Sequence, residues 1–329
     1  MSIFEDQGYL NPKYDRFNKF TKTALKSFWT PAKYKQKIES KDAFEYRNHL
    51  DESLKSLIER CILSVSVVED KVKLFWGLIP LDYPQTLISD AASMLSMQEV
   101  VHRRSYNSLG KAIGVPRDAI ERYPILKDRI KYLNKHLEED VNITGNARKL
   151  KKLTLFTGLV EKISLTVSFY ILMSPAKRIN KLKGISELQA TTAVEENFHF
   201  DFGLEIINTV KEENPEIWTE YLVQHMNKNF MMAYETELKM IDWFFEKGVP
   251  DFITKEEVIN VLNYNFNFVS NKLGLGLDFE YDEELYREKN EWFFVMTKSP
   301  LAIDFFDGTA GGYSGEKEVD SIDIDAFEL

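Results

Sequence analysis

Cysteine is almost absent from this chain, and its scarcity excludes two kinds of structure. Among 329 residues only Cys61 carries a thiol, so no disulfide can form within the chain and no zinc site can be built from several cysteines. Free thiols without disulfides are typical of the reducing cytoplasm. We therefore expect a cytoplasmic protein whose chemistry depends on other side chains.

An excess of positive charge and a membrane-spanning segment are also missing. The chain carries 42 lysines and arginines against 52 aspartates and glutamates, a net charge of −10, which argues against a surface that neutralises phosphates. The N-terminal residues lack the apolar centre of a signal peptide, and we find no uninterrupted run of roughly 18 apolar residues. Neither nucleic acid nor a membrane is an expected partner.

Apolar residues, by contrast, are abundant and recur at helical spacing. Hydrophobic residues make up 44% of the chain and aromatic residues 13%, enough for a large core. Between Leu50 and Val68 they repeat every three or four positions, which is the period of an amphipathic helix. No segment shows the sustained alternation of a strand, so we predict an all-α fold. The predicted helices cover residues 42–76, 86–112, 118–141, 147–172, 186–211, 215–246, 255–272 and 284–298.

Local signals suggest where several helices begin. Asp42 and Thr254 are each followed three residues later by glutamate, the spacing of a capping box. Ser174 and Asn214 are each followed by proline, which is favoured at the first position of a helix. We therefore predict a helix start at each of these four residues.

Composition divides the chain into three parts. Residues 1–41 are mixed, basic and aromatic, and we expect an arm packed on the main domain. Residues 42–304 form the predicted helical domain. Residues 305–329 hold four of the fifteen glycines and then turn acidic, with too little apolar surface to fold alone. We predict a flexible tail, and its acidic and apolar end, finishing on Phe327 and Leu329, is typical of a docking peptide.

Two matched motifs carry most of the functional information. Glu99 and His102 form one Glu-x-x-His motif, and Glu196 and His199 form the other. Residues three apart on a helix share a face, so each motif directs a carboxylate and an imidazole to the same place. Two such helices, with one carboxylate from each of two further helices, form the dimetal-carboxylate site of a ferritin-like bundle.

The two further carboxylates lie in long apolar stretches. Glu161 is one, and Glu69 is the other, with the neighbouring Asp70 as an alternative. Carboxylates are rare in a core unless they are paired or coordinated. Four of them balance the charge of two divalent ions, and two neutral imidazoles add ligands without adding charge. The predicted ligands of a two-ion site are Glu69, Glu99, His102, Glu161, Glu196 and His199.

The ligand types indicate the metal, and a nearby phenol suggests its use. Oxygen-rich sites with two imidazoles suit iron or manganese, whereas zinc prefers tetrahedral sites richer in nitrogen or sulfur. We expect two iron ions, with dimanganese or mixed manganese and iron as alternatives. Tyr106 follows His102 by four residues and so lies one turn along the same face. It is either an ordinary core tyrosine or a phenol that the metal pair oxidises.

In this order and spacing, the residues resemble one known family. Glu69, the motif at Glu99 with Tyr106, Glu161 and the motif at Glu196 resemble the small, radical-generating subunit of class I ribonucleotide reductase, over nearly the whole chain. The resemblance implies a ferritin-like homodimer with a dimetal centre. It also implies that the radical serves a large catalytic subunit, which reduces ribonucleotides to deoxyribonucleotides. Whether a flavoprotein activator supplies the oxidant stays open.

The resemblance also implies roles for individual residues. Tyr106 would hold the stable radical, Trp29 matches the tryptophan near the metal site, and Glu195 matches the acidic residue that links this tryptophan to His102. In the tail, Tyr313 would relay the radical to the large subunit, while Phe327 and Leu329 would anchor the tail there.

Two features depart from the family pattern, and two other functions are possible. Glu69 stands where many relatives carry aspartate, and Leu165 and Thr192 stand where some carry bulkier apolar residues near the radical. A ligand-binding oxidase of the same superfamily would share the metal ligands without needing a relay tail. A helical metal-binding protein without enzymatic activity is the other alternative.

Overall fold

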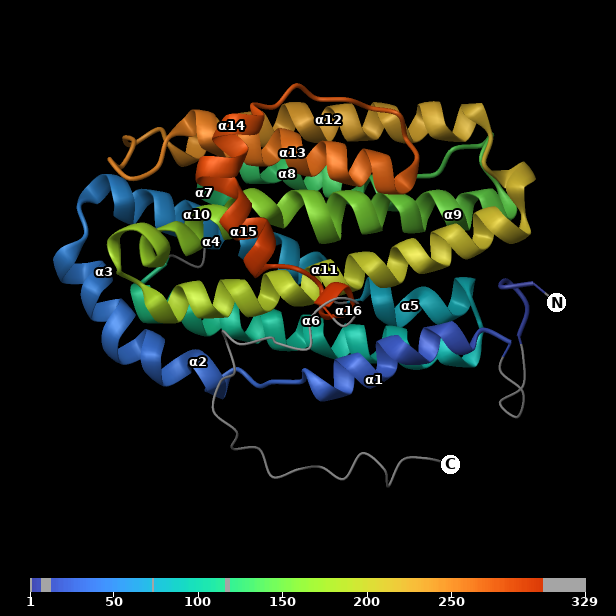
Figure 1. Ribbon diagram of the computed structural model, residues 1–329, viewed down its shortest axis with the longest axis horizontal. Helices are drawn as coiled ribbons and strands as arrows, with labels where there is room; N and C mark the ends of the chain where they lie inside the picture. Colours follow the sequence, from blue (N-terminus) through green and yellow to red (C-terminus); the bar gives the residue numbers. More distant parts are fainter. Residues whose placement is uncertain (1, 7–12, 73, 116–118, 304–329) are drawn as a thin grey trace.

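The computed structural model describes residues 2–6, 13–72, 74–115 and 119–303, and these residues form helices joined by turns and irregular connections. The long helices run roughly along the longest axis of the molecule (Figure 1). The only strand-type pairing among the described residues is an isolated bridge between Asp140 and Ile143. The predicted all-α class is confirmed.

Most of the chain is α-helical, with shorter π-helical and 3₁₀ segments between. The α-helices are α1 (Asn18–Lys26), α2 (Ala32–Lys37), α3 (Ala43–His49), α4 (Glu52–Val72), α5 (Phe75–Asp82), α6 (Thr86–Ile113), α7 (Ala119–Arg122), α8 (Pro124–Leu133), α9 (Gly145–Leu155), α10 (Ser164–Ile179), α11 (Lys183–Glu213), α12 (Glu220–Phe244), α13 (Lys255–Leu273), α14 (Glu283–Leu285), α15 (Glu291–Met296) and α16 (Pro300–Ile303). The π-helical segments are η2 (Ile38–Asp42), η4 (Phe156–Ile163) and η6 (Tyr286–Asn290), and the 3₁₀ segments are η1 (Asp15–Phe17), η3 (Asn134–Leu137) and η5 (Pro215–Ile217).

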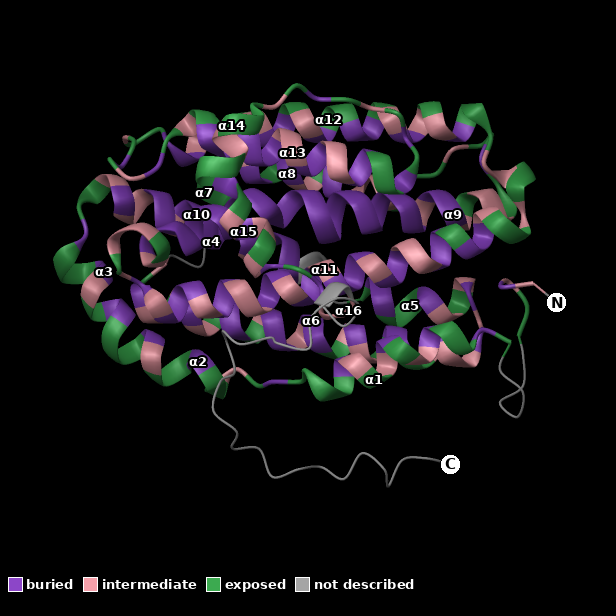
Figure 2. Ribbon diagram, viewed as in Figure 1, coloured by how far each residue is buried: buried purple, intermediate pink, exposed green. Residues whose placement is uncertain are grey.

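One long helix occupies the centre of the bundle. Segments α9, η4 and α10 join into a helix over Gly145–Ile179, which is long and apolar enough to cross a membrane by length and composition. Its most apolar stretch is entirely buried within the protein (Figure 2). Its α10 part packs against α4, α11 and α13. Burial among other helices therefore accounts for its apolar composition.

Two glycines allow this central helix to approach its neighbours closely. A Cβ atom at Gly203 of α11 would overlap Thr157 of η4, and one at Gly158 of η4 would overlap Phe230 of α12. Any larger residue would push the helices apart. Because η4 and α11 both carry predicted metal ligands, this close approach helps to set the spacing of the site.

Some of the predicted helix boundaries are confirmed. Helix α6 ends at Gly114, which adopts a left-handed conformation with φ of 85°, the usual end of a helix. Helix α13 begins after Thr254, whose hydroxyl accepts a hydrogen bond from the Glu257 backbone N–H at 3.2 Å. Both signals are local, so the sequence alone reveals them.

Other predicted boundaries are wrong because tertiary contacts override the local signal. Asp42 lies inside helical backbone, and its carboxylate accepts a hydrogen bond from the backbone N–H of Ile185 at 2.5 Å instead of capping a helix. The helix predicted over 42–76 divides at Leu50, and α4 starts where Asp51 accepts from the Leu54 N–H at 2.8 Å.

Proline was also a misleading signal. Pro175 begins no helix; it lies buried inside α10, four residues before its end, where the missing N–H costs only one intrahelical bond. Pro80 lies inside α5, in the gap between the helices predicted over 42–76 and 86–112. After Asn214 comes a short 3₁₀ turn, and Thr219 caps α12 instead.

Candidate dimetal centre

Four helical segments bring the six predicted ligands to one place in the interior. Helix α4 contributes one carboxylate, α6 and α11 each contribute a Glu-x-x-His motif, and the π-helical η4 contributes the last carboxylate. None of the six residues is more than 3% exposed. They are Glu69, Glu99, His102, Glu161, Glu196 and His199.

These side chains form two overlapping groups, each suited to one ion. The first is Glu69, Glu99, His102 and Glu196, and the second is Glu99, Glu161, Glu196 and His199; within each group the ligand atoms lie within 4.8 Å of one another. Glu99 and Glu196 belong to both groups, so these two carboxylates can bridge a pair of ions.

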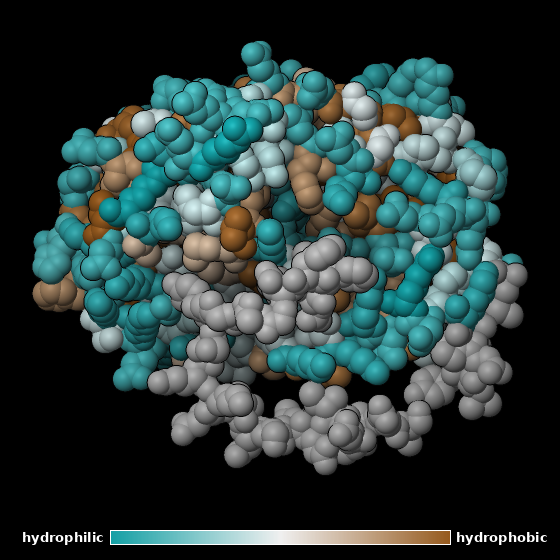
Figure 3. All heavy atoms as spheres, viewed as in Figure 1, coloured by the Kyte–Doolittle hydropathy of each residue, from teal (hydrophilic) through white to brown (hydrophobic). Residues whose placement is uncertain are grey.

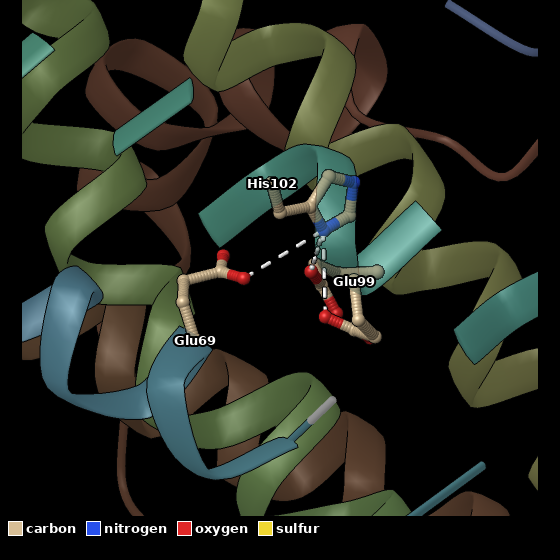
Figure 4. A group of neighbouring side chains, drawn as sticks. Glu69, Glu99 and His102 are labelled. Carbon is tan, nitrogen blue, oxygen red and sulfur yellow. Dashed lines mark ion pairs between the residues drawn. The ribbon is translucent and has the colours of Figure 1, made fainter. Parts of the chain in front are cut away.

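The two imidazoles present the same nitrogen to the carboxylates. His102 Nδ1 lies 3.0 Å from Glu196, 3.6 Å from Glu99 and 3.8 Å from Glu69. Figure 4 shows Glu69 and Glu99 directed toward this nitrogen, while the other ring nitrogen faces away. His199 Nδ1 lies 2.9 Å from Glu99, 3.3 Å from Glu161 and 3.5 Å from Glu196.

The outer nitrogen of His102 is held by Glu195. Glu195 Oε2 lies 2.6 Å from His102 Nε2 and accepts a hydrogen bond from Trp29 Nε1 at 2.8 Å. With Nε2 donating to this carboxylate, the lone pair of Nδ1 points inward to bind an ion. The contact between Trp29, Glu195 and His102 that the resemblance implied is therefore present.

Gln98 connects this arrangement to the second imidazole. Its amide nitrogen donates to Glu195 Oε1 at 2.8 Å, and its amide oxygen lies 3.1 Å from His199 Nε2. The two ligand histidines are thus joined through one buried amide and one buried carboxylate. Both imidazoles have an acceptor on the outside and direct Nδ1 toward the carboxylates of the cluster.

Trp76 of α5 positions the carboxylate from η4. Its indole N–H donates to Glu161 Oε1 at 2.9 Å, leaving Glu161 Oε2 to face His199. Glu161 lies in a π-helical segment, a backbone irregularity often found at functional sites.

The inner atoms of the cluster lack hydrogen-bond partners among the described residues. They are both carboxylate oxygens of Glu69, Glu99 and Glu196, and Nδ1 of His102. Buried polar atoms without partners are costly unless another group satisfies them. Two divalent cations would supply both the missing contacts and the compensating charge, so the residues present fit a dimetal centre.

Burial and neighbouring charges shift the pKa of several of these side chains toward the protonated form. Burial raises the pKa of Glu69 and of Glu161 well above the ordinary carboxylate value. Burial alone would lower the pKa of His102, but contacts with Glu195, Glu196 and Glu99 outweigh it and raise that pKa. Metal ions must displace these protons, so binding is coupled to proton release.

Tyr106 lies beside the cluster but is hydrogen-bonded elsewhere. It is 1% exposed, and its hydroxyl donates to Gln189 Oε1 of α11 at 2.9 Å. Burial, followed by the charge of Glu69, raises the pKa of the phenol well above its ordinary value. The phenol is therefore neutral and sheltered from solvent.

Not every predicted residue can be placed. Tyr313, Phe327 and Leu329 lie outside the described residues, as does the side chain of Asp70, while Glu69 joins the cluster. Trp76, Gln98 and Gln189 were not predicted. Gln189 shares a helix face with Glu196, seven residues on, and Gln98 lies four residues before His102, so helical spacing from the motifs could have indicated both.

Comparison with known families identifies the chain's relatives. The family model described as ribonucleotide reductase, small chain, matches residues 8–288. This chain belongs to that family.

Two curated relatives of this small chain are each named ribonucleoside-diphosphate reductase subunit beta, so its family is one of oxidoreductases. The protein from Treponema pallidum is 23% identical over 325 residues, covering 92% of this chain and 86% of the relative. The protein from Chlamydia pneumoniae is 30% identical over 105 residues, which cover 32% of this chain and only 30% of that protein.

Solved structures share the fold of the small chain. The ribonucleotide reductase R2 subunit from Clostridium botulinum matches with a TM-score of 0.73 and 19% identity, over 87% of this chain and 89% of that one. An R2-like ligand-binding oxidase with a Mn/Fe cofactor matches with a TM-score of 0.65 and 14% identity, over 82% of this chain and 99% of the oxidase. The predicted ferritin-like bundle is thereby confirmed.

Proposed function

We propose that this small chain holds two metal ions, generates a radical on Tyr106 and supplies it to a large subunit that reduces ribonucleotides. The observation that carries the proposal is the convergence of six buried ligands, with unpartnered inner atoms, one helical turn from a sheltered phenol. Iron or manganese suits these ligands, with iron as the first expectation and dimanganese or a mixed pair as alternatives. When bound, such ions supply one-electron oxidation.

The chain's own residues position the ligands and connect the site to the outside. Glu195 and Gln98 keep the outer nitrogens of both imidazoles engaged, which fixes the tautomer needed for metal binding. Trp29 is 6% exposed and bonded to Glu195. We assign Trp29, Glu195 and His102 to the route by which the oxidising equivalent leaves the site, with Tyr313 continuing it in the tail.

The partners follow from this role. The large subunit would bind the tail through Phe327 and Leu329.

For a homodimer, an exposed apolar row is available: Leu74, Leu78 and Leu81 are 66%, 47% and 77% exposed, with spacings of four and three residues that place them on one helix face. Polar residues cover most of the face seen in Figure 3. Reaction in the cytoplasm is consistent with the buried free thiol of Cys61.

A surface cleft suggests where an activating flavoprotein would deliver its oxidant. The cleft has a volume of about 470 Å³ and includes Lys162, Asn197 and Thr297. The same three residues also line a cavity beside Glu161 and Glu196. A small oxidant released at the cleft would therefore have a short path to the metal ligands.

The space next to the metal ligands is small. The cavity beside Glu161 and Glu196 measures about 10 Å³, which is about the space of one water molecule. An organic substrate of a ligand-binding oxidase would therefore have to bind in the neighbouring cleft of about 470 Å³, a volume typical of such sites. A reductase subunit, whose nucleotide binds to its partner, needs no such space.

The proposal is tested with Tyr106→Phe, which keeps the ring and removes the hydroxyl. We expect the variant to bind two ions but to lose the tyrosyl signal in electron paramagnetic resonance, along with reductase activity in the presence of the large subunit. Full activity would exclude a phenoxyl mechanism.

Removal of residues 307–329 separates the two enzymatic functions. A reductase subunit should lose affinity for the large subunit while its metal content is unchanged. If the truncated chain instead retained all of its measurable oxidase turnover and the full-length chain never bound the large subunit, the oxidase would be the better assignment.

A further inference from the structure

The hydrogen bond of Tyr106 involves an amide that has two chemically different ends. The phenol donates to Gln189 Oε1 at 2.9 Å, and both side chains are at most 1% exposed. The other end of the amide, Gln189 Nε2, is buried and has no hydrogen-bond partner among the described residues. The amide oxygen of Gln189 thus accepts a hydrogen bond, while its NH₂ group donates none within the described part of the chain.

Oxidation of the phenol would reverse what its oxygen requires. A phenol hydroxyl donates a hydrogen bond, whereas a phenoxyl radical has lost that hydrogen and can only accept one. Gln189 Oε1 would then face an oxygen with nothing to donate. Two facing acceptors in a dry interior are unfavourable, because each is left without its partner.

Rotation of the amide removes this conflict. The terminal torsion of glutamine is broad and roughly two-fold, so a half-turn exchanges Oε1 for Nε2 with little change in shape. Resting on the proposed radical at Tyr106, we propose that Gln189 is a positioning residue whose amide reverses when the phenol is oxidised. It accepts from the hydroxyl in the resting state and donates from Nε2 to the phenoxyl oxygen afterwards.

The electron and proton of this step go elsewhere. Oxidation of Tyr106 would transfer one electron to the one-electron oxidant that the proposed metal site supplies and the hydroxyl proton to Glu69, the carboxylate whose charge acts most on the phenol, so that the O–H bond breaks. Gln189 takes up neither, because an amide oxygen is too weak a base to keep the proton. Its contribution is a new N–H···O hydrogen bond, which stabilises the radical.

Thr192 is the competing donor on the same helix. Its hydroxyl lies close enough to the phenol to lower the pKa of the phenol. Its hydroxyl proton, however, is already donated to the Leu188 carbonyl at 3.0 Å. Gln189 Nε2 has protons that are not engaged in this way, so the amide is the better donor to a radical.

The decisive measurement uses the unaltered chain, grown with glutamine labelled with ¹⁵N at the side-chain amide and loaded with metal. Electron–nuclear double resonance on the tyrosyl radical should detect a ¹⁵N coupling and an exchangeable-proton coupling. In metal-free protein, ultraviolet resonance Raman spectroscopy should report a phenol that donates a hydrogen bond.

Two matched variants assign these signals. Gln189→Leu should lose the ¹⁵N coupling, the exchangeable-proton coupling and the phenol hydrogen bond, and the largest g-value of its radical should rise. Thr192→Val, which is nearly isosteric, should retain all of them.

The outcomes separate this inference from the proposed function. A tyrosyl radical without ¹⁵N coupling in the unaltered chain, or one whose proton coupling disappears only in Thr192→Val, overturns the amide reversal and leaves the radical assignment standing. A chain that binds both ions and never forms a tyrosyl radical overturns both.

Discussion

Replacing Glu195 by glutamine should weaken both metal positions, although Glu195 contacts only one of the two imidazoles. The carboxylate accepts three hydrogen bonds, from Trp29 and His102 at Oε2 and from Gln98 at Oε1. Glu195→Gln has almost the same shape but only one acceptor atom. If the oxygen of the new glutamine keeps the contacts with Trp29 and His102, its NH₂ group faces the NH₂ group of Gln98.

The conflict between these two amides is then passed on to the second imidazole. Gln98 can relieve this conflict by reversing its own amide. In the unaltered chain Gln98 Oε1 lies 3.1 Å from His199 Nε2, so after the reversal the NH₂ group of Gln98 would face that nitrogen instead. His199 would respond by moving its proton to Nδ1. That nitrogen faces Glu99 and Glu161 and would no longer have a lone pair for metal.

The size of the expected loss in metal affinity follows from the role of Glu195 as a residue that supports a metal ligand. Loss of such a residue typically weakens metal binding about 10- to 100-fold, or roughly 1.4 to 2.7 kcal/mol for each ion. We expect Glu195→Gln to show this loss at both positions. Anaerobic competition between the protein and a chelator for Mn²⁺ measures each affinity, and circular dichroism checks that the fold is retained.

A second substitution tests whether Gln98 carries the effect. Gln98→Met preserves the side-chain volume and removes both the donor and the acceptor of the amide. In the double variant Glu195→Gln with Gln98→Met, no NH₂ group faces His199 Nε2, so the His199 proton has no reason to move from Nε2 to Nδ1. The affinity of the double variant for the ion next to His199 should recover toward that of the Gln98→Met single variant. The reasoning is refuted if Glu195→Gln binds both ions within about twofold of the unaltered chain, or if the second substitution makes no difference.

Three further predictions concern neighbouring features. Trp76→Phe removes the 2.9 Å hydrogen bond to Glu161, and we expect about tenfold weaker binding of one ion by chelator competition. Arg129→Leu leaves the fully buried Glu237 without the cation at 2.9 Å; urea titration should show a loss of about 3 to 5 kcal/mol in the free energy of unfolding, with metal stoichiometry unchanged. The third prediction concerns pH. Because contacts with carboxylates raise the pKa of His102 above its ordinary 6.5 despite burial, its contribution to the stability of the metal-free protein is complete below pH 6.5 and is lost as pH rises through the higher folded-state pKa. Thermal unfolding of metal-free protein should therefore occur at lower temperature as pH rises above 6.5, whereas metal affinity should increase, since ions displace these protons.

The predicted ligands were accessible from the sequence because their pattern is local. The two Glu-x-x-His motifs, and Tyr106 one turn after the first, follow from helical spacing within single segments. Glu69 and Glu161 were indicated by the apolar residues around them. In the structure all of these residues are buried, and the six candidate ligands lie in two overlapping groups, which is the arrangement that the pattern predicted.

Helix boundaries were less accessible where a residue has a distant partner. Asp42 has the spacing of a cap, yet its carboxylate bonds to the backbone of Ile185, far along the chain. Pro175 resembles a helix start, yet the packing of α10 against its neighbours keeps it inside a helix. In each case a contact between distant segments outweighs the local preference.

Residue type and spacing alone indicated the helical class, the candidate ligands, with Asp70 as an alternative to Glu69, and the position of the phenol, because a helix places residues three and four apart on a common face. Only the tertiary structure decided which atoms hold those ligands: Gln98 joins two imidazoles on different helices, Trp76 reaches Glu161 across 85 residues, and Gln189 meets Tyr106 across 83. Such contacts depend on how separate helices pack, and no pattern within a single segment contains that information.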